Sequence, residues 1–198
     1  FCACVALRTE SQVRDLFYYA NRELQGKLTI MPAMDIYFAT GWNKIPAHWF
    51  SSGLEFWAPS RWLRPGDTRS SIPCCITHNV GCYDMYLWSP PVPDHIVEQF
   101  DFMNRDAGHD YRIIWHFYIE GYHVRNPCND VLIYHNHISS DRKSRAGIAP
   151  VNTGGRTYWC QAAASMREEC SVYSEEDREE MLNLLDAAQS HATSDHTV

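Results

Sequence analysis

The segment TESQVRDLFYYANRELQG, residues 9–26, decides the fold class because it places an amphipathic helix ahead of every other element. Its apolar residues recur at intervals of three and four, the spacing that puts them on one face of an α-helix. These residues are Val13, Leu16, Phe17, Ala20 and Leu24. Thr9 or Ser11 can cap the start of such a helix, and Gly26 can end it. We therefore predict a helix over residues 9–25.

The signals that follow this helix are typical of strands, up to about residue 160. Residues 111–122 are the clearest case, because two sets of residues alternate along this segment, as they do on the two faces of a strand. One set is Tyr111, Ile113, Trp115, Phe117 and Ile119, and the other is Arg112, Ile114, His116, Tyr118 and Glu120. Residues 131–138 and 156–160 are two further predicted strands, and residues 139–146 have turn composition. A helix followed by an antiparallel sheet is an α+β fold, and we predict that the first helix packs on this sheet.

Two segments complete the predicted organisation. Residues 58–107 hold most of the prolines, and we expect long loops around short strands there. A second helix is predicted over residues 174–190, where Ser174 and Asp177 have the spacing of a capping box. The chain is then an α+β domain over residues 1–165 with a C-terminal helical extension over residues 166–198, packed on or flanking that domain.

The composition predicts a folded domain that is not a general nucleic-acid binder. Of the 198 residues, 45% are hydrophobic, which gives the chain enough apolar surface for a core. The net charge of −7 opposes phosphate binding, which Lys and Arg largely supply. No apolar run approaches the roughly 18 residues that a membrane-spanning helix requires. We expect no membrane partner and no cofactor.

Cysteine usage predicts disulfides and extracellular chemistry. Eight cysteines are scattered along the chain, and their spacing is not that of a zinc site. They are Cys2, Cys4, Cys74, Cys75, Cys82, Cys128, Cys160 and Cys170. The pairing pattern as a whole does not follow from the sequence, and we predict no metal. A chain that starts at Phe1 also has the form of a mature secreted protein.

Five short strings occur in order along the chain. They are PAHWFSSG (46–53), YLWSP (86–90), GHDY (108–111), VLIY (131–134) and AGIAPVNTG (146–154). Together with the early helix, they resemble the guanyl-specific fungal ribonucleases and their ribotoxin relatives of the α-sarcin type. The resemblance covers roughly residues 1–160. It implies a microbial ribonuclease-like fold and, as in that family, a terminal disulfide, here Cys4–Cys160, with Cys2 paired elsewhere.

The resemblance also implies where catalytic residues would lie. That family uses a Glu with a His as base, an Arg to stabilise charge and a second His as acid. The first His falls at His48, but the other three positions hold Trp88, Val131 and Asn152. These three side chains neither exchange protons near neutral pH nor carry positive charge. A conventional ribonuclease mechanism is therefore not expected, and His48 has an alternative interpretation as a structural histidine.

A shifted strand register would bring other groups toward His48. The candidates for such a rebuilt site are His116, Glu120, His135 and His137.

A secreted, acidic ribonuclease scaffold without its catalytic groups is similar to the ribonuclease-like effectors of plant-pathogenic fungi. We therefore expect a pseudoenzyme, a non-enzymatic virulence or avirulence protein that binds a host protein. We also expect that it is a target for a plant immune receptor and that it is translocated into host cells. Loops on a rigid scaffold commonly carry binding. The candidate contact residues are Trp57, Trp62, Arg142, Lys143 and Arg145.

Two alternatives remain. One is an active secreted ribonuclease or ribotoxin with a rearranged site around His48. The other is a pseudo-ribonuclease that binds RNA, which the acidic net charge disfavours. For the tryptophans, the alternative to a recognition surface is a place in the core.

Overall fold

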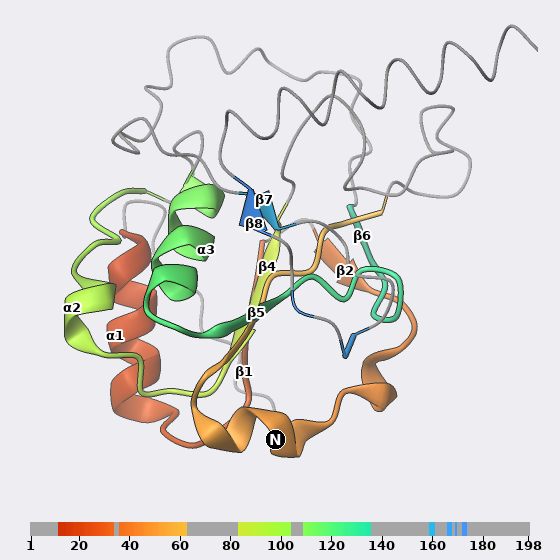
Figure 1. Ribbon diagram of the computed structural model, residues 1–198, viewed down its shortest axis with the longest axis horizontal. Helices are drawn as coiled ribbons and strands as arrows, with labels where there is room; N and C mark the ends of the chain where they lie inside the picture. The colour runs from red at the N-terminus through yellow and green to blue at the C-terminus, as the bar shows by residue number, and fades with distance from the viewer. Residues whose placement is uncertain are drawn as a thin grey trace, which may run out of the picture.

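A four-stranded sheet lies at the centre of this computed structural model (Figure 1). The structure describes residues 12–33, 36–62, 83–103, 109–135, 159–160, 166–167, 169 and 172–173. The strands are β1 (Thr29–Pro32), β4 (Met85–Trp88), β3 (Glu55–Trp57) and β5 (His123–Arg125), in that spatial order. β4 pairs antiparallel with both β1 and β3.

The sheet is mixed, which corrects the prediction of an antiparallel sheet. β5 pairs with β3 in parallel, with Phe56 opposite Val124. The chain reaches β5 only after the helix α3 (His109–Ile119) has carried it back along one face of the sheet. β5 therefore enters beside β3 in the same direction, as parallel neighbours need such a crossover. The coarser prediction, an α+β arrangement, agrees with the structure.

The first predicted helix is confirmed as α1 (Val13–Glu23). Val13, Phe17 and Ala20 are buried, which is the apolar stripe that the sequence shows. At its start the Gln12 amide donates to Asp15 Oδ2 at 2.9 Å. The three α-helices among the described residues, α1, α3 and the short α2 (Asp94–Val97), lie on the same side of the central sheet in Figure 1.

The prediction of a strand over residues 111–122 is wrong, because most of this segment belongs to the helix α3. Its buried residues, Tyr111, Ile113, Ile114 and Phe117, follow helical spacing. Ile114 shares its alternating set with the charged residues Arg112 and Glu120, yet it is fully buried. Because large apolar residues occur in both alternating sets, a period of two does not discriminate here. Gly121, with φ +79°, follows the helix in the turn to β5.

Shorter elements surround the sheet. β2 (Ile36–Phe38) pairs antiparallel with β6 (Ile133–His135), which confirms part of the strand predicted over residues 131–138. β7 (Trp159–Cys160) pairs antiparallel with β8 (Val172–Tyr173), and β7 lies at the end of the strand predicted over residues 156–160. Two 3₁₀ helices, η1 (Trp42–Lys44) and η2 (Ala47–Ser52), precede β3.

Several predictions fall on parts of the chain that the structure does not describe. The helix over residues 174–190 and the loop over residues 139–146 lie outside the described residues. The division after residue 165 stays a prediction. Cys128, fully buried, is the one cysteine whose side chain is described, so the predicted disulfides, Cys4–Cys160 included, also stay predictions. Within the described segments, no helix has the length and apolar character to cross a bilayer.

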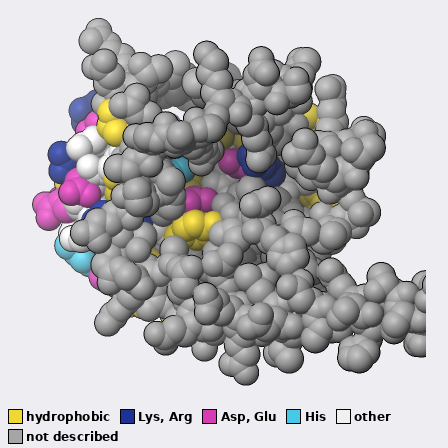
Figure 2. Space-filling model, turned by 90° about the horizontal axis from the view of Figure 1, so that it is seen from above, with side chains coloured by type: hydrophobic (Ala, Val, Ile, Leu, Met, Phe, Trp, Pro, Cys, Tyr) yellow, Lys and Arg dark blue, Asp and Glu magenta, His cyan; other side chains and the backbone are white. Residues whose placement is uncertain are grey.

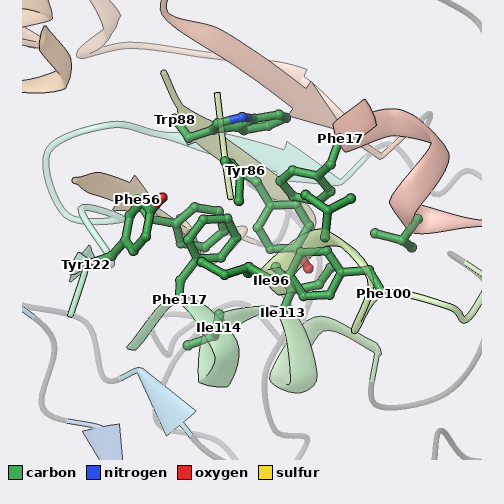
Figure 3. Packing of buried hydrophobic residues seen from close by; sticks show 14 of the residues in the cluster. Phe17, Phe56, Tyr86, Trp88, Ile96, Phe100, Ile113, Ile114, Phe117 and Tyr122 are labelled. Carbon is green, nitrogen blue, oxygen red and sulfur yellow. The ribbon is translucent and has the colours of Figure 1, made fainter. Parts of the chain in front are cut away.

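The two faces of the sheet contribute to two separate hydrophobic clusters. On the helix side, Phe56 and Trp88 pack against the helices (Figure 3). The ring centroids of Phe56 and Phe117 are 3.7 Å apart, and those of Phe17 and Trp88 are 4.7 Å apart. We call this group the helix-face cluster. The opposite-face cluster comprises Phe50, Trp57, Met85, Leu87, Val131 and Ile133. Alternation of side chains along each strand produces this division.

Candidate functional site

His48, the residue that matches a family catalytic position, lies on η2 with an exposed side chain. Its imidazole contacts the ring of Trp49, with 6.4 Å between centroids. Among the described residues, no carboxylate or cation lies within hydrogen-bonding distance of the imidazole. The groups that a rearranged ribonuclease site would need around His48 are therefore not found in the described part of the chain.

The other catalytic positions carried over from the resemblance do not converge on His48. Trp88 is 1% exposed and lies in the helix-face cluster. Val131 is fully buried in the opposite-face cluster. The sheet separates these two positions, so they do not line a common site. Asn152 lies outside the described residues.

The candidates for a rebuilt site are also dispersed. His116 lies half-buried on α3 with its ring 5.9 Å from that of Phe100, and burial lowers the pKa of His116 below its usual value. Glu120 binds His95 Nε2 at 2.9 Å on the surface. The backbone of His135 pairs with β2, and His137 lies outside the described residues.

A buried ion pair on the opposite face of the sheet was not predicted. Arg125 Nε donates to Glu55 Oε2 at 2.9 Å, and its Nη2 donates to Glu55 Oε1 at 3.2 Å. The Nε1 of Trp57 donates to Glu55 Oε2 at 2.9 Å. The parallel register of β3 and β5 places Arg125 opposite Trp57, two residues from Glu55 and on the same face of the sheet. Glu55 and Arg125 are 6% and 9% exposed, so each charge needs the other.

The remaining surface of the Arg125 guanidinium is also occupied. It lies over the ring of Trp49, 5.1 Å from the centroid, and its Nη1 donates to the carbonyl of Arg167. Glu169 Oε1 lies 2.7 Å from His123 Nδ1 and 4.0 Å from Arg125 Nη2. A phosphate or carboxylate ligand would reach Arg125 only by displacing these groups.

A second polar cluster lies where the segment after β3, the start of β4 and the first turn of α3 come together. Arg61 Nη1 and Asp84 Oδ2 are 2.8 Å apart, and the Tyr111 amide donates to Asp110 Oδ1 at 3.2 Å. Burial, and next the negative charge of Asp84, raise the pKa of Asp110 to about 7. The Tyr86 hydroxyl is buried and has no hydrogen-bond partner among the described residues. Burial and the Asp110 carboxylate raise the pKa of Tyr86 well above its usual value.

The sequence holds a weak signal for both polar groups. Glu55 is a lone charge within an apolar run, whereas Arg125 lies between Val124 and Asn126 in a more polar stretch. A charge within a buried strand must have a partner, although the pattern does not say which one. Asp110 has no signal in the sequence beyond its place in the GHDY string. In the described ranges, no group of three or more His, Cys, Asp or Glu side chains is placed to hold a metal ion.

The predicted contact residues are only partly at the surface. Trp57 is fully buried, so it belongs to the core and not to a recognition surface. Trp62 is half-buried and donates through Nε1 to the Cys128 carbonyl at 2.6 Å. Arg142, Lys143 and Arg145 lie outside the described residues. In Figure 2, the described basic side chains are interspersed with acidic ones, and no single-sign patch is visible in this view.

These observations define an α+β domain with a mixed central sheet, a buried ion pair on one face of it and a half-buried polar cluster near the starts of β4 and α3. No protein-family model, no curated protein and no solved structure matches this chain.

Proposed function

We propose that this chain is a non-enzymatic, secreted effector on a ribonuclease-like scaffold, and that it binds a host protein. The scaffold and the secretion rest on the resemblance of the five strings and on the cysteine count. The observation that carries the absence of ribonuclease chemistry is the position of Trp88 and Val131. They are buried in different clusters on opposite faces of the sheet, away from the exposed His48.

The chemical requirement of RNA cleavage supports this proposal. Attack of the 2′-hydroxyl needs a base, an acid and a cation around one phosphate. In the described residues, the buried acid Glu55 and the buried cation Arg125 bind each other. Their hydrogen bonds use three Arg125 nitrogens and both Glu55 oxygens. Hydrogen bonds therefore occupy the charged atoms of both side chains.

The first test is cleavage of labelled RNA and of intact ribosomes by the purified, oxidised protein in EDTA. The matched control is the His48→Ala variant, whose exposed position predicts an unchanged fold. We expect neither protein to cleave RNA. Cleavage by the wild type that the variant loses would refute the proposal and support the rearranged ribonuclease. Salt-sensitive RNA affinity without cleavage would support the RNA-binding pseudo-ribonuclease instead.

The second test addresses the host partner. The protein is crosslinked in plant extract, the captured partner is identified, and direct binding is measured with the purified partner. The variant with Arg142, Lys143 and Arg145 all changed to Glu tests the predicted contact loop. Arg22→Glu is the control, because Arg22 is an exposed cation on α1, with a side chain 72% exposed. Saturable binding that the triple variant loses and the control keeps supports the proposal. Lack of saturable binding to any purified candidate contradicts it.

A further inference from the structure

A short segment between β7 and β8 in the chain packs beside the edge strand β5 of the central sheet. The structure describes three of its residues, Met166, Arg167 and Glu169, which we call the docked segment. The Met166 side chain packs against the opposite-face cluster, and its amide donates to Asp130 Oδ2 at 2.6 Å. The docked segment therefore lies on the face of the sheet that carries the Glu55–Arg125 pair.

Two side chains of β5 hold the rest of the docked segment. Arg125 Nη1 donates to the Arg167 carbonyl, and His123 Nδ1 donates to Glu169 Oε1 at 2.7 Å. Glu169 Oε1 is also 4.0 Å from Arg125 Nη2. His123 and Arg125 are two residues apart on one strand, so their side chains lie on the same face. An amide, a carbonyl and a carboxylate of the docked segment are thus each received by a different side chain.

The contacts define what a peptide must contain to replace the docked segment. The contacts with Asp130 and with Arg125 Nη1 use main-chain atoms, which a peptide of other sequence also supplies. Side chains contribute at two positions, the apolar Met166 and the acidic Glu169. In peptide recognition, main-chain hydrogen bonds provide affinity and side-chain contacts provide specificity. The pattern is an apolar residue followed three positions later by an acid.

We propose that this face of the sheet is a peptide-binding site, and that the docked segment occupies it as an intramolecular ligand. The ligand class is a protein segment with an apolar residue followed three positions later by an acidic one. A partner with this pattern displaces the docked segment and takes over its contacts. The inference rests on the proposed function in one respect, since it names the kind of segment that a host partner would present.

The receiving side chains are held in place independently of the docked segment. Glu55 fixes Arg125 through two hydrogen bonds, and the Trp49 ring lies under the guanidinium, 5.1 Å from it. Among the described strands, β7 and β8 pair only with each other, so departure of the docked segment breaks no strand pairing of the central sheet. A preformed site of this kind binds a ligand with little cost of ordering.

The acidic end of the docked segment is the part that exchanges most easily. The side chains of His123 and Glu169 are 48% and 54% exposed, so a partner can approach this pair directly from solvent. An ion pair this exposed changes a binding equilibrium by no more than about fivefold. The Arg125 guanidinium, in contrast, is buried and needs an acceptor at Nη1, which the docked segment or a partner's carbonyl provides.

The donor and acceptor pattern of the site favours a peptide over a nucleic acid. Asp130 Oδ2 accepts an N–H group from the docked segment. A phosphate group offers acceptors only, so it would meet the Asp130 carboxylate without a hydrogen bond to give. The Glu55 carboxylate also balances the charge of Arg125 from within the sheet. A peptide supplies the N–H, the carbonyl and the acid that the site receives.

The test uses the full chain and a labelled peptide, Ala-Ala-Ser-Met-Arg-Glu-Glu, which copies residues 163–169. Fluorescence anisotropy measures its binding to the wild type and to Glu169→Gln, both shown to be folded by far-UV circular dichroism. In the wild type the docked segment competes from within the chain, at an effective concentration on the order of millimolar. Met166→Ser is the second variant, which loosens the apolar end of the docked segment. His123→Ala, added to Glu169→Gln, removes the group that receives the acid. The matched control is His95→Ala, because His95 binds Glu120 at 2.9 Å in another exposed pair.

We expect Glu169→Gln to bind the peptide about fivefold more tightly than the wild type does. A peptide whose last Glu is changed to Gln should bind Glu169→Gln about fivefold more weakly. His123→Ala should abolish this preference for the acid, whereas His95→Ala should keep it. Bound peptide should also reduce the amide exchange protection of Met166, because it displaces the bond to Asp130.

Three results would overturn the inference. One is lack of saturable binding to folded Glu169→Gln and Met166→Ser at millimolar peptide. Another is binding in which the preference for the acid survives His123→Ala, and the third is binding that leaves the Met166 amide protected. The experiment needs no host protein, so its failure leaves the proposed function to its own test with a host partner.

Discussion

Each charge of the Glu55–Arg125 pair should depend on the other in the folded state, and Arg125→Met tests this dependence. The substitution keeps much of the side-chain volume but removes both hydrogen bonds to Glu55, the bond to the Arg167 carbonyl and the contact with Trp49. Glu55 then keeps the Nε1 of Trp57 as a donor. Removal of one partner from a buried pair leaves an uncompensated charge, and we expect a loss of about 3–5 kcal/mol in the free energy of unfolding.

The double variant Glu55→Leu, Arg125→Met separates the pair from its individual charges. It leaves no buried charge, and its main cost is the lost acceptor for Trp57 Nε1, about 1–3 kcal/mol. The double variant should therefore be no less stable than Arg125→Met alone. Urea unfolding at pH 7, followed by tryptophan fluorescence and far-UV circular dichroism, provides the four free energies of the cycle.

The control is Arg22→Met, because the Arg22–Glu23 pair lies on the surface with side chains 72% and 46% exposed. It should change stability by no more than about 0.5 kcal/mol. A loss below about 1 kcal/mol in Arg125→Met would refute the structural role. Additive losses in the double variant would show that the two charges do not depend on each other.

Three further changes test the fold and the pH response. Gly41→Ala should cost at least about 2 kcal/mol, measured by urea unfolding, because φ is +95° and a Cβ would lie 1.8 Å from the Asp130 carbonyl oxygen. Trp88→Glu introduces the carboxylate that the resembled ribonucleases carry at this position. It should unfold the protein at pH 7 and produce no RNA cleavage, since the position is 1% exposed; folded, active protein would contradict the proposed loss of ribonuclease chemistry. Burial lowers the pKa of His116 below 6.5, the usual pKa of histidine, so the folded state loses stability as the pH falls below 6.5. His116→Gln should reduce that loss in unfolding experiments across pH 5–7.

The first helix could be predicted because its information is local. Its apolar residues form one helical stripe, and the buried residues Val13, Phe17 and Ala20 belong to it. In residues 111–122 the apolar residues do not mark one face of a strand. The buried residues Tyr111, Ile113 and Phe117 fall in one alternating set, and Ile114 falls in the other. A buried helix and a buried strand then have similar sequences, and packing against α1 and the sheet decides between them.

The candidate site could not be predicted for a related reason. A match of short strings assigns residues to positions along the chain, but it does not say on which face of a sheet each residue lies. Trp88 and Val131 match two catalytic positions of the resembled ribonucleases, yet they are buried in clusters on opposite faces of the sheet. The two polar groups that the structure does assemble join residues of separate segments, and neither partner identifies the other in the sequence.

The sequence by itself determined the mixed α+β class, the N-terminal helix and the large apolar content of the core, because these depend on composition and on periodicity within short segments. Only the tertiary structure decided the parallel pairing of β3 with β5, and with it the partnership of Glu55 and Arg125 across 70 positions of chain. It also brought Asp84 to Asp110, where burial and a neighbouring charge change the proton affinity of a carboxyl. Proton affinity and ion pairing depend on distances and burial, which a linear pattern does not contain.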